Sequence, residues 1–461
     1  MRTHSCYGCA ETLYTEGVPG LSVRRHGRWT TVSLIVGISV VVACVVAFVV
    51  VGYQDVAILV ASAVLVIGII FADPMLLVVL ALPATILMAR VGGILSLSDF
   101  VLAAATLVAL VLYRAHGMRS MSSVLWAGTF YLATALPTVI LNPYAANGIE
   151  FAHEVMLVLG SMVVGYSIGR EGRSRQAVGI YIVGCLAIAV AAVIMGVYGL
   201  ATTGEFGPVY LPGLDKNLIG GLTASAIIIL YARPVWFTID SRATWAAIVV
   251  CGFGMLASGA RQAMIGAVIG LVVVSLRKRP ETGRRPKLVW LVGAPVVFYV
   301  LVMVNEQLSS DNPFNSANQR LDWYAQTIDI WLTSPVFGVG LRWWYTSRFG
   351  VNFQPPNAEF EVGSSVGLVG LIGFLAMFVV AIVALWRMNP AYGLAGAAIV
   401  ASRFGAAQFD LYWVAGQASF LWIIAALCYG ARDRDREAGV STTGADARRA
   451  LSSSASGYRL A

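Results

Sequence analysis

NEQLSSDNPFNSANQRLDWYAQTIDIWLTSPVFGVGLRWWYTSRFGVNFQPPNAEFEV, residues Asn305–Val362, is the only long polar stretch in this chain. Apolar runs flank it on both sides, Leu288–Val304 before it and Gly363–Trp386 after it. A connection this long between elements is usually either functional or disordered. Disordered segments are poor in aromatic residues, whereas this stretch is rich in Trp, Tyr and Phe. We therefore expect residues 305–362 to form an ordered, functional loop.

The composition of the whole chain indicates an integral membrane protein. Its 461 residues are 58% hydrophobic and only 12% charged, and the mean hydropathy is +0.79. A soluble domain carries about 25% charged residues, so this chain cannot cover itself with a polar surface. The apolar runs are also too long for the strands of a membrane β-barrel. We predict an all-α, polytopic membrane protein embedded in the bilayer, and we expect no binding to nucleic acid.

About 14 apolar runs, with 12–14 as the range, qualify as transmembrane helices, although several are shorter than the roughly 20 residues of a typical span. The runs are Thr30–Val51, Val56–Ala72, Met75–Ala89, Leu97–Tyr113, Ser123–Leu141, Phe151–Ile168, Ala177–Leu200, Leu218–Tyr231, Trp245–Ala257, Ala263–Leu276, Leu288–Val304, Gly363–Trp386, Ala391–Ala407 and Leu411–Tyr429. The predicted organisation is a cytoplasmic tail at residues 1–29, a transmembrane domain at residues 30–429, and a disordered cytoplasmic tail at residues 430–461.

The basic residues predict the orientation. If the N-terminus is cytoplasmic, all but seven of the 31 Lys and Arg residues lie on the cytoplasmic side, which is their usual bias. Both termini are then cytoplasmic and the loop at residues 305–362 is external. The seven exceptions are Arg90, Lys216, Arg261, Arg320, Arg342, Arg348 and Arg403. For Arg90, Arg348 and Arg403, an ordinary surface charge is at least as good an interpretation as a functional one.

Arg261 and Lys216 are the candidates that precede the loop. Arg261 lies between two apolar runs with almost no connection, and a charge at that depth is costly unless it faces a cavity or a partner. Lys216 lies at the outer start of a span, where Asn217 can cap the helix and an anion can bind its N–H groups. Asp215 can instead pair with Lys216, which makes this second site weaker.

The loop contains further candidates. Residues Ser316–Thr333 have helical periodicity, with Tyr324 on the apolar stripe and Arg320 on its shoulder. Such a helix lies on the bilayer surface or covers a cavity. Arg342, Trp343 and Trp344 follow a glycine turn; aromatic residues beside Arg suit sugar stacking and, equally, an interfacial belt.

The order of these motifs is recognisable. Asn217 opens one span, and S-G-A-R at Ser258–Arg261 opens another; R-L-D-W-Y at Arg320–Tyr324 leads to S-P-V-F-G-V-G at Ser334–Gly340, and Pro356-Asn357 precedes E-F-E-V-G-S-S-V-G-L-V-G-L-I-G at Glu359–Gly373. This order resembles the O-antigen ligase and polymerase superfamily of membrane glycosyltransferases. The resemblance covers roughly Leu211–Tyr429.

The resemblance implies a transferase in the bacterial inner membrane that takes a glycan from a polyprenyl-diphosphate carrier at the external face. It joins that glycan to a hydroxyl group of a glycan or lipid acceptor, without a metal ion or other cofactor, for a cell-surface polysaccharide. By position, Arg261 and Arg320 match arginines that neutralise the diphosphate. We expect substrate binding by Lys216, Asn217, His153, Tyr324, Arg342, Trp343 and Trp344.

One departure from the family pattern concerns the acceptor. Ligases of the family carry His-Asn where this chain has Pro356-Asn357, so the histidine that assists the acceptor hydroxyl is absent. Glu359 and Glu361 follow closely, and burial can raise the pKa of a glutamate toward neutrality. We predict Arg261, Arg320, Asn357 and Glu359 as the catalytic set. For His153, pairing with Glu150 or Glu154 is a better interpretation than catalysis.

The missing histidine favours a polymerase or an atypical ligase over an ordinary ligase. A transporter or flippase of lipid-linked glycans is the alternative from another class. Against it, the cytoplasmic halves of the predicted spans are almost purely apolar and no inverted repeat is evident. A catalytically inactive relative that binds the same lipid is a third interpretation.

Overall fold

The computed structural model describes residues 71–439 apart from residues 89, 92–94, 113–117, 205 and most of 278–315. The predicted spans Thr30–Val51 and Leu288–Val304 and nearly all of Val56–Ala72 lie outside the described residues, as does the predicted N-terminal tail. The regular secondary structure of the described part is helical except for one antiparallel hairpin, which the all-α prediction did not include. Its strands are β1 (Arg90–Val91) and β2 (Leu95–Ser96).

Every predicted span that the structure describes coincides with a helix, or with the continuous run α6–η2–α7 in the case of Phe151–Ile168. The elements are α3 (Pro74–Ala84), α4 (Leu97–Leu112), η1 (Met118–Met121), α5 (Ser122–Leu141), α6 (Ala145–Val155), the π-helical η2 (Met156–Gly160), α7 (Ser161–Arg170), α8 (Ser174–Thr203), α9 (Lys216–Ala232), α10 (Ser241–Ser258), α11 (Arg261–Ser275), α13 (Ser316–Leu332), η3 (Trp343–Tyr345), α14 (Ala358–Arg387), α15 (Pro390–Ala406) and α16 (Ala415–Glu437).

Five of the described helical segments are long and apolar enough to cross a membrane, so the protein is a multi-pass membrane protein. They are Met118–Leu141, Ala145–Arg170, Ser174–Thr203, Ser241–Ser258 and Ala358–Arg387. Helices α3, α4, α9 and α11 are apolar but shorter. The total of about 14 spans and the external position of the loop remain predictions.

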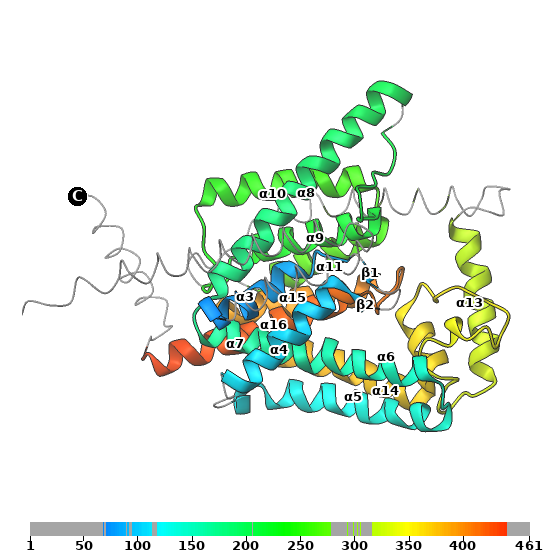
Figure 1. Ribbon diagram of the computed structural model, residues 1–461. Helices are drawn as coiled ribbons and strands as arrows, with labels where there is room; N and C mark the ends of the chain where they lie inside the picture. The colour runs from blue at the N-terminus through cyan, green and yellow to red at the C-terminus, as the bar shows by residue number, and fades with distance from the viewer. Residues whose placement is uncertain are drawn as a thin grey trace, which may run out of the picture. The chain divides into compact units, whose positions relative to one another are not determined.

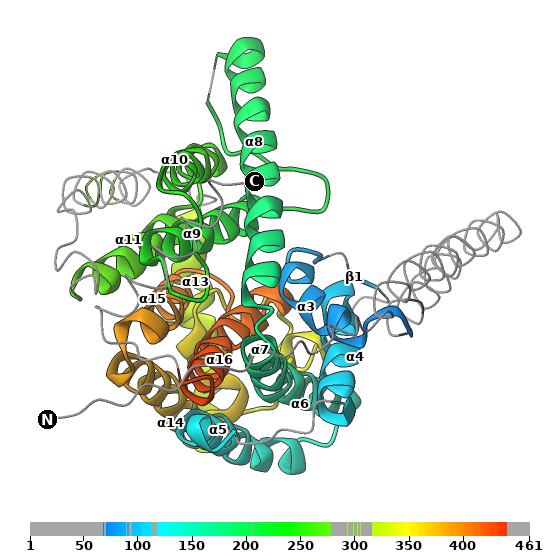
Figure 2. The same ribbon diagram turned by 90° about the vertical axis from the view of Figure 1, so that its left-hand side faces the viewer.

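Helices α11, α14 and α16 each pack against two neighbouring helices, and α15 contacts all three of them. Helix α14 packs against α5 and α15, and α16 packs against α7 and α15 (Figure 1). Helix α11 packs between α9 and α15, as the view in Figure 2 also shows. Gly266 lets α11 approach α15 closely, because an added Cβ would lie 3.0 Å from the Ser402 carbonyl oxygen of α15. These contacts bring the starts of α9 and α11 close to the end of α15.

A break inside α14 attaches the polar loop to the helix bundle. Gly367 has φ 69° within α14, and an added Cβ would lie 2.3 Å from the Val336 backbone. The Val339 N–H donates to the Ser364 carbonyl at 2.9 Å, and the Leu368 N–H donates to the Pro335 carbonyl at 2.9 Å. A side chain at 367 would prevent this approach and disfavour the backbone conformation. The motif S-P-V-F-G-V-G is therefore the segment that docks into α14.

Two predicted boundaries need correction. Helix α16 continues to Glu437, past the predicted start of the disordered tail at residue 430, because Tyr166 donates to Asp433 and Tyr392 donates to Asp435. The loop prediction also ended too late, since α14 already begins at Ala358.

Helix α13 has nearly the predicted bounds, but its buried side is shifted from the predicted apolar stripe, of which Tyr324 still contacts Phe360 of α14. Thr327 and Ile330 are buried against the rest of the structure, whereas Leu321 and Leu332 are 55% and 67% exposed. The reason is that α13 packs against α14 through the side that carries Thr327 and Ile330.

Candidate functional site

Lys216, Arg261 and Arg320 lie together at the end of the bundle where α9 and α11 begin; we call them the cation cluster. Lys216 is the first residue of α9 and Arg261 is the first residue of α11. Both Arg261 and Arg320 act electrostatically on the Lys216 ammonium. In the part of the chain that the structure describes, neither Lys216 nor Arg320 forms an ion pair. The structure thus brings together three residues that the sequence analysis selected separately.

The two helix starts add to this positive charge. Gly220 of α9 faces Ala260, the residue before α11, and a Cβ there would lie 2.6 Å from the Ala260 Cβ. The first N–H groups of a helix have no partner within the helix and carry the positive end of its dipole. Asp215, not Asn217 as predicted, caps α9 by accepting from the Leu218 N–H at 2.9 Å. Its carboxylate is therefore used in the cap.

Asp410 links the residues next to Lys216 and Arg261. It lies in the α15–α16 connection (407–414) and is 9% exposed. The Asn217 Nδ2 donates to Asp410 Oδ1 at 3.3 Å, and the Gln262 Nε2 donates to Asp410 Oδ2 at 3.4 Å. Burial raises the pKa of the Asp410 carboxyl above its ordinary value, while Arg403 and Arg320 oppose that rise. One carboxyl therefore holds the residues next to Lys216 and Arg261.

Arg403 supports the same connection from α15. Its Nη2 donates to the carbonyl oxygens of Leu411 and Tyr412, at 2.8 Å and 3.0 Å. Arg403 is one of the seven exceptional basic residues, for which the sequence left a surface charge at least as good an interpretation as a functional one. Asp410 and Gln262 were not predicted, although Asp410 stands as a lone acid between two apolar runs.

A cavity of about 40 Å³ lies inside the bundle behind the cation cluster. Its walls come from α9, α11, α15 and α16 and carry both polar and small side chains, including Ser225, Ala263, Gly266, Arg403 and Gln417. Ala263 is two residues along α11 from Arg261, but Lys216, Arg261 and Arg320 do not line the cavity.

The start of α14 lies beside the α15–α16 connection. Asn357 caps α14 by accepting from the Phe360 N–H at 3.0 Å, and its Nδ2 donates to the Gln408 carbonyl at 3.0 Å. Glu359 Oε1 accepts from Gln408 Nε2 at 2.7 Å. The other oxygen of Glu359 is buried and has no hydrogen-bond partner in the described ranges. Both polar groups of the Asn357 side chain are thus used in hydrogen bonds that hold the start of α14, whereas Glu359 retains one oxygen that can accept a hydrogen bond.

Tyr324 connects α13 to this region. Its hydroxyl donates to the Pro356 carbonyl at 3.3 Å, and its ring lies 5.0 Å from the Phe360 ring. Burial raises the pKa of Tyr324, and Arg320 and Asp410 both act on its hydroxyl. Tyr324 therefore lies beside the cation cluster, where the sequence analysis expected a substrate-binding residue.

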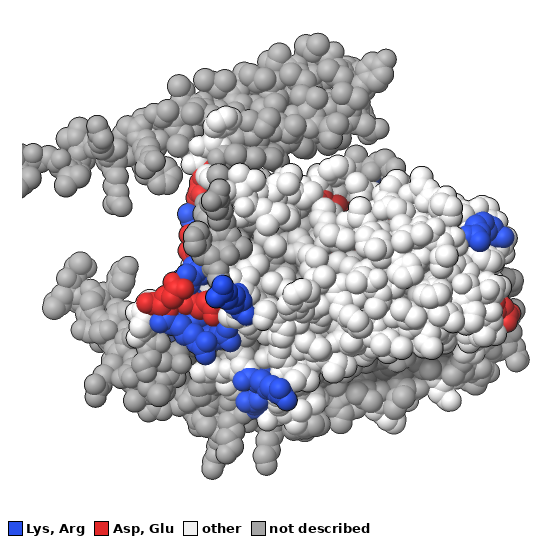
Figure 3. Space-filling view, turned by 90° about the horizontal axis from the view of Figure 1, so that it is seen from below, with Lys and Arg blue, Asp and Glu red and all other residues white. Residues whose placement is uncertain are grey.

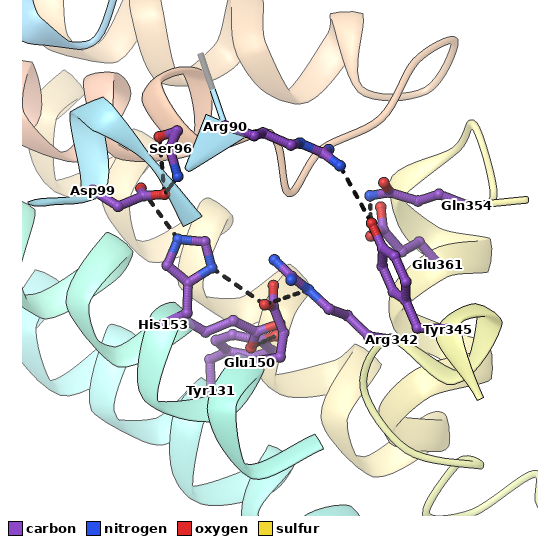
Figure 4. Close-up of polar contacts among 11 residues, drawn as sticks. Arg90, Ser96, Asp99, Tyr131, Glu150, His153, Arg342, Tyr345, Gln354 and Glu361 are labelled. Atoms are coloured by element: carbon purple, nitrogen blue, oxygen red, sulfur yellow. Dashed lines mark hydrogen bonds and ion pairs between the residues drawn. The ribbon is translucent and has the colours of Figure 1, made fainter. Parts of the chain in front are cut away.

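A second polar region, the His153 network, consists of Asp99, Glu150, His153 and Arg342 (Figure 4). His153 Nδ1 lies 3.2 Å from Glu150 Oε2, and His153 Nε2 lies 3.2 Å from Asp99 Oδ1. Glu150 Oε2 also lies 2.5 Å from Arg342 Nε. Asp99, Glu150 and His153 are each at most 5% exposed. The His153 imidazole and the Arg342 guanidinium thus face two carboxylates inside the protein, and the expected pairing of His153 with Glu150 is confirmed.

The His153 network fastens the loop to α6. Arg342 adopts a left-handed backbone conformation, with φ 52°, and the Leu341 N–H donates to Asn147 Oδ1 at 2.9 Å. Trp343 is fully buried, and its Nε1 donates to Ser364 Oγ at 3.1 Å; Trp344 is 9% exposed. The aromatic residues therefore form a small core within the loop, which matches neither the sugar-stacking surface nor the interfacial belt.

Two further glutamates line a small cavity next to the His153 network. Tyr131 donates to Glu154 Oε2 at 2.7 Å, and Gln354 donates to Glu361 Oε1 at 2.7 Å. The remaining oxygens, Glu154 Oε1 and Glu361 Oε2, have no hydrogen-bond partner among the described residues. The cavity of about 10 Å³ has the size of one water molecule. Within the described ranges, no group of three or more His, Cys, Asp or Glu residues could hold a metal ion.

Residues 246–375 match the family described as O-antigen ligase. This segment is similar to the O-antigen ligase superfamily. The O-antigen ligase match runs from α10 into α14, so it includes Arg261, Arg320 and the segment that docks into α14. The predicted resemblance is thereby confirmed, and the chain is related to glycosyltransferases of the ligase and polymerase type. No curated protein matches the chain.

Proposed function

We propose that the protein transfers or polymerises a glycan carried on polyprenyl diphosphate, and that the cation cluster binds the diphosphate. The observation that carries this proposal is the meeting of Lys216, Arg261 and Arg320 at two helix starts, where Asp410 bonds to Asn217 and Gln262, the residues next to Lys216 and Arg261. Charge-assisted hydrogen bonds from guanidinium groups and N–H groups at helix starts are well suited to phosphate oxygens. The same end of the bundle would face the outside of a bacterial inner membrane.

In the proposed reaction, a hydroxyl oxygen of the acceptor attacks the anomeric carbon of the donor glycan. A new carbon–oxygen bond forms, the bond from the anomeric carbon to the phosphate oxygen breaks, and the carrier leaves as a diphosphate. Negative charge increases on that diphosphate during the reaction, and fixed cations lower the barrier when they are placed where charge develops. Arg261 and Arg320 would supply the forked contacts, and Lys216 would add a point charge.

Glu359 is the group that would accept the proton of the acceptor hydroxyl. Its buried oxygen without a partner and its position beside the α15–α16 connection support this role. Asn357 would act indirectly, because both polar groups of its side chain are used to hold the start of α14.

The test uses the full-length protein in detergent with a polyprenyl-diphosphate oligosaccharide and a glycan acceptor. Release of the carrier diphosphate and elongation of the acceptor are measured together. Arg261→Ala and Arg320→Ala should each lower both by about 100-fold or more, and Arg119→Ala serves as a control of equal charge change. Activity should be unchanged by EDTA.

The outcomes separate the candidate functions. Full activity in both arginine variants, or strict dependence on a metal ion, contradicts the proposal. Donor binding without release of the diphosphate would instead indicate an inactive lipid-binding relative. Movement of intact donor across a vesicle membrane would indicate a flippase.

A further inference from the structure

A groove of about 530 Å³ lies at the opposite end of α14 from the cation cluster. It lies where the start of α5 and the ends of α14 and α16 meet. Its lining residues are Ser120, Ser123, Val379, Val380, Val383, Ala384, Arg387, Met388, Tyr429 and Arg432. A space of this volume is typical of a small-molecule site. One wall is apolar, and the mouth carries two guanidinium groups.

The ends of three helices place this groove at a membrane–water boundary. Met118–Leu141 and Ala358–Arg387 are both candidate membrane spans, and Ser120 and Arg387 lie at adjacent ends of them. Figure 3 shows a broad, mostly uncharged face, with a cluster of Lys, Arg, Asp and Glu residues at one end of it and a few charged residues near the other end. Charged residues at the end of an apolar face are typical of the headgroup region.

The apolar wall of the groove continues into a surface that suits lipid chains. Leu368, Ile372, Val379 and Val383 of α14 are exposed at 52%, 54%, 59% and 40%. Their spacing places them on one side of the helix. Val379 and Val383 belong to both this stripe and the groove, so an acyl chain lying along α14 would bring its headgroup to the two arginines.

Arg432 and Arg387 differ in their partners: Arg432 forms an ion pair, and Arg387 forms none among the described residues. Arg432 binds Asp433 Oδ1 through Nη2 at 3.0 Å and lies over the Tyr429 ring at 5.1 Å. Asp433 also accepts from Ser120 and from Tyr166, so its charge is shared among several donors. Arg387 is exposed and forms no ion pair in the described part of the chain. The groove therefore retains positive charge that a single phosphate can neutralise.

We propose that this groove binds one anionic phospholipid of the surrounding bilayer, with its phosphate at Arg387 and Arg432 and an acyl chain along Val379 and Val383. Basic pockets between transmembrane helices bind anionic headgroups in this way. Ser123 and Tyr429 would supply hydroxyl groups to the remaining phosphate oxygens, whereas the Ser120 hydroxyl already donates to Asp433. This site is independent of the proposed transferase activity.

Native mass spectrometry of the full-length protein tests the proposal with phosphatidylglycerol and phosphatidylcholine of identical acyl chains. The wild type should retain one phosphatidylglycerol more tightly than phosphatidylcholine. Arg387→Gln and Arg432→Gln should each weaken that retention about fivefold, the equivalent of about 1 kcal/mol per basic residue. Arg119→Gln, which removes an exposed charge at the same end outside the groove, should change nothing.

A second variant removes the space without removing charge. Val383→Trp should reduce phosphatidylglycerol retention, whereas added inorganic phosphate should not displace the lipid. Equal retention of the two lipids by the wild type shows annular lipid only and overturns the proposal. It is also overturned if Arg387→Gln behaves as Arg119→Gln does, or if inorganic phosphate competes fully.

Discussion

The cation cluster is half-buried and the His153 network is buried, and the two polar regions balance charge in opposite ways. In the network, His153 and Arg342 face Asp99 and Glu150 at 2.5–3.2 Å, so the charges neutralise one another. In the cluster, Lys216 and Arg320 form no ion pair among the described residues, and the nearby Asp410 carboxyl, whose pKa burial raises above its ordinary value, bonds to Asn217 and Gln262 instead. A self-neutralised region stabilises the fold, whereas a region with excess charge is suited to a ligand of opposite charge.

The largest expected effect is on stability, in the network. Glu150→Gln should lower the free energy of unfolding by about 3–5 kcal/mol, because it leaves Arg342 and His153 buried beside a neutral group. Denaturant unfolding of the purified protein in detergent measures this. Combining Glu150→Gln with Arg342→Gln should recover part of the loss. A cost below about 1 kcal/mol for the single variant means that the network does not fasten the loop.

The next effect is on activity, in the cluster. Arg320→Ala should lower glycan transfer about 100-fold, while the free energy of unfolding stays unchanged or rises because repulsion with Lys216 is relieved. Arg348→Ala is the matched control, since Arg348 is in the same loop but binds Asn142 and the Val339 carbonyl instead. If Arg320→Ala lost as much stability as activity, the distinction between the two regions would disappear.

A smaller effect concerns the pH dependence of stability at Asp410. Because its pKa is raised, the folded protein holds this proton more tightly than the unfolded chain does. The free energy of unfolding should therefore fall as pH rises from the ordinary aspartate pKa to the raised value. Asp410→Asn should remove that decline, and unfolding curves over a series of pH values measure it. An unchanged decline in the variant assigns it to another group.

The smallest effect is expected in the aromatic core of the loop. Trp343→Phe removes the hydrogen bond to Ser364 Oγ but keeps a ring in the same place. It should lower the free energy of unfolding by about 1 kcal/mol and leave glycan transfer intact. A large loss of transfer with normal stability would instead support the sugar-binding role that the sequence analysis gave to Trp343.

Much of the fold could be predicted from the sequence because its helices are long and apolar or strongly periodic. The bounds of α13 and α5 agree closely with the predicted ranges. The hairpin at Arg90–Ser96 could not be predicted, since each strand has only two residues and shows no alternation. The buried side of α13 also depends on its packing against α14, which periodicity alone does not specify.

The candidate site could be predicted for residues that depart from the usual distribution of charge across a membrane. Arg261, Arg320 and Lys216 stood out because basic residues favour the cytoplasmic side. Glu150 was a foreseeable partner of His153, because residues three apart in a helix are neighbours. Asp99 was not, nor was the pairing of Glu150 with Arg342, because these contacts join segments far apart in the sequence. The role of Asp410 could not be predicted either, because its partners Asn217 and Gln262 lie far from it in the sequence.

The central claim is that the cation cluster binds the diphosphate of a lipid carrier. The most direct measurement is the affinity of the full-length protein for polyprenyl diphosphate and polyprenyl monophosphate, with Arg261→Ala, Arg320→Ala and Lys216→Met as variants. We expect tighter binding of the diphosphate, and a loss of about tenfold or more in each arginine variant, as for charge-assisted hydrogen bonds. Equal affinity for the two lipids, or unchanged affinity in both arginine variants, would contradict the account.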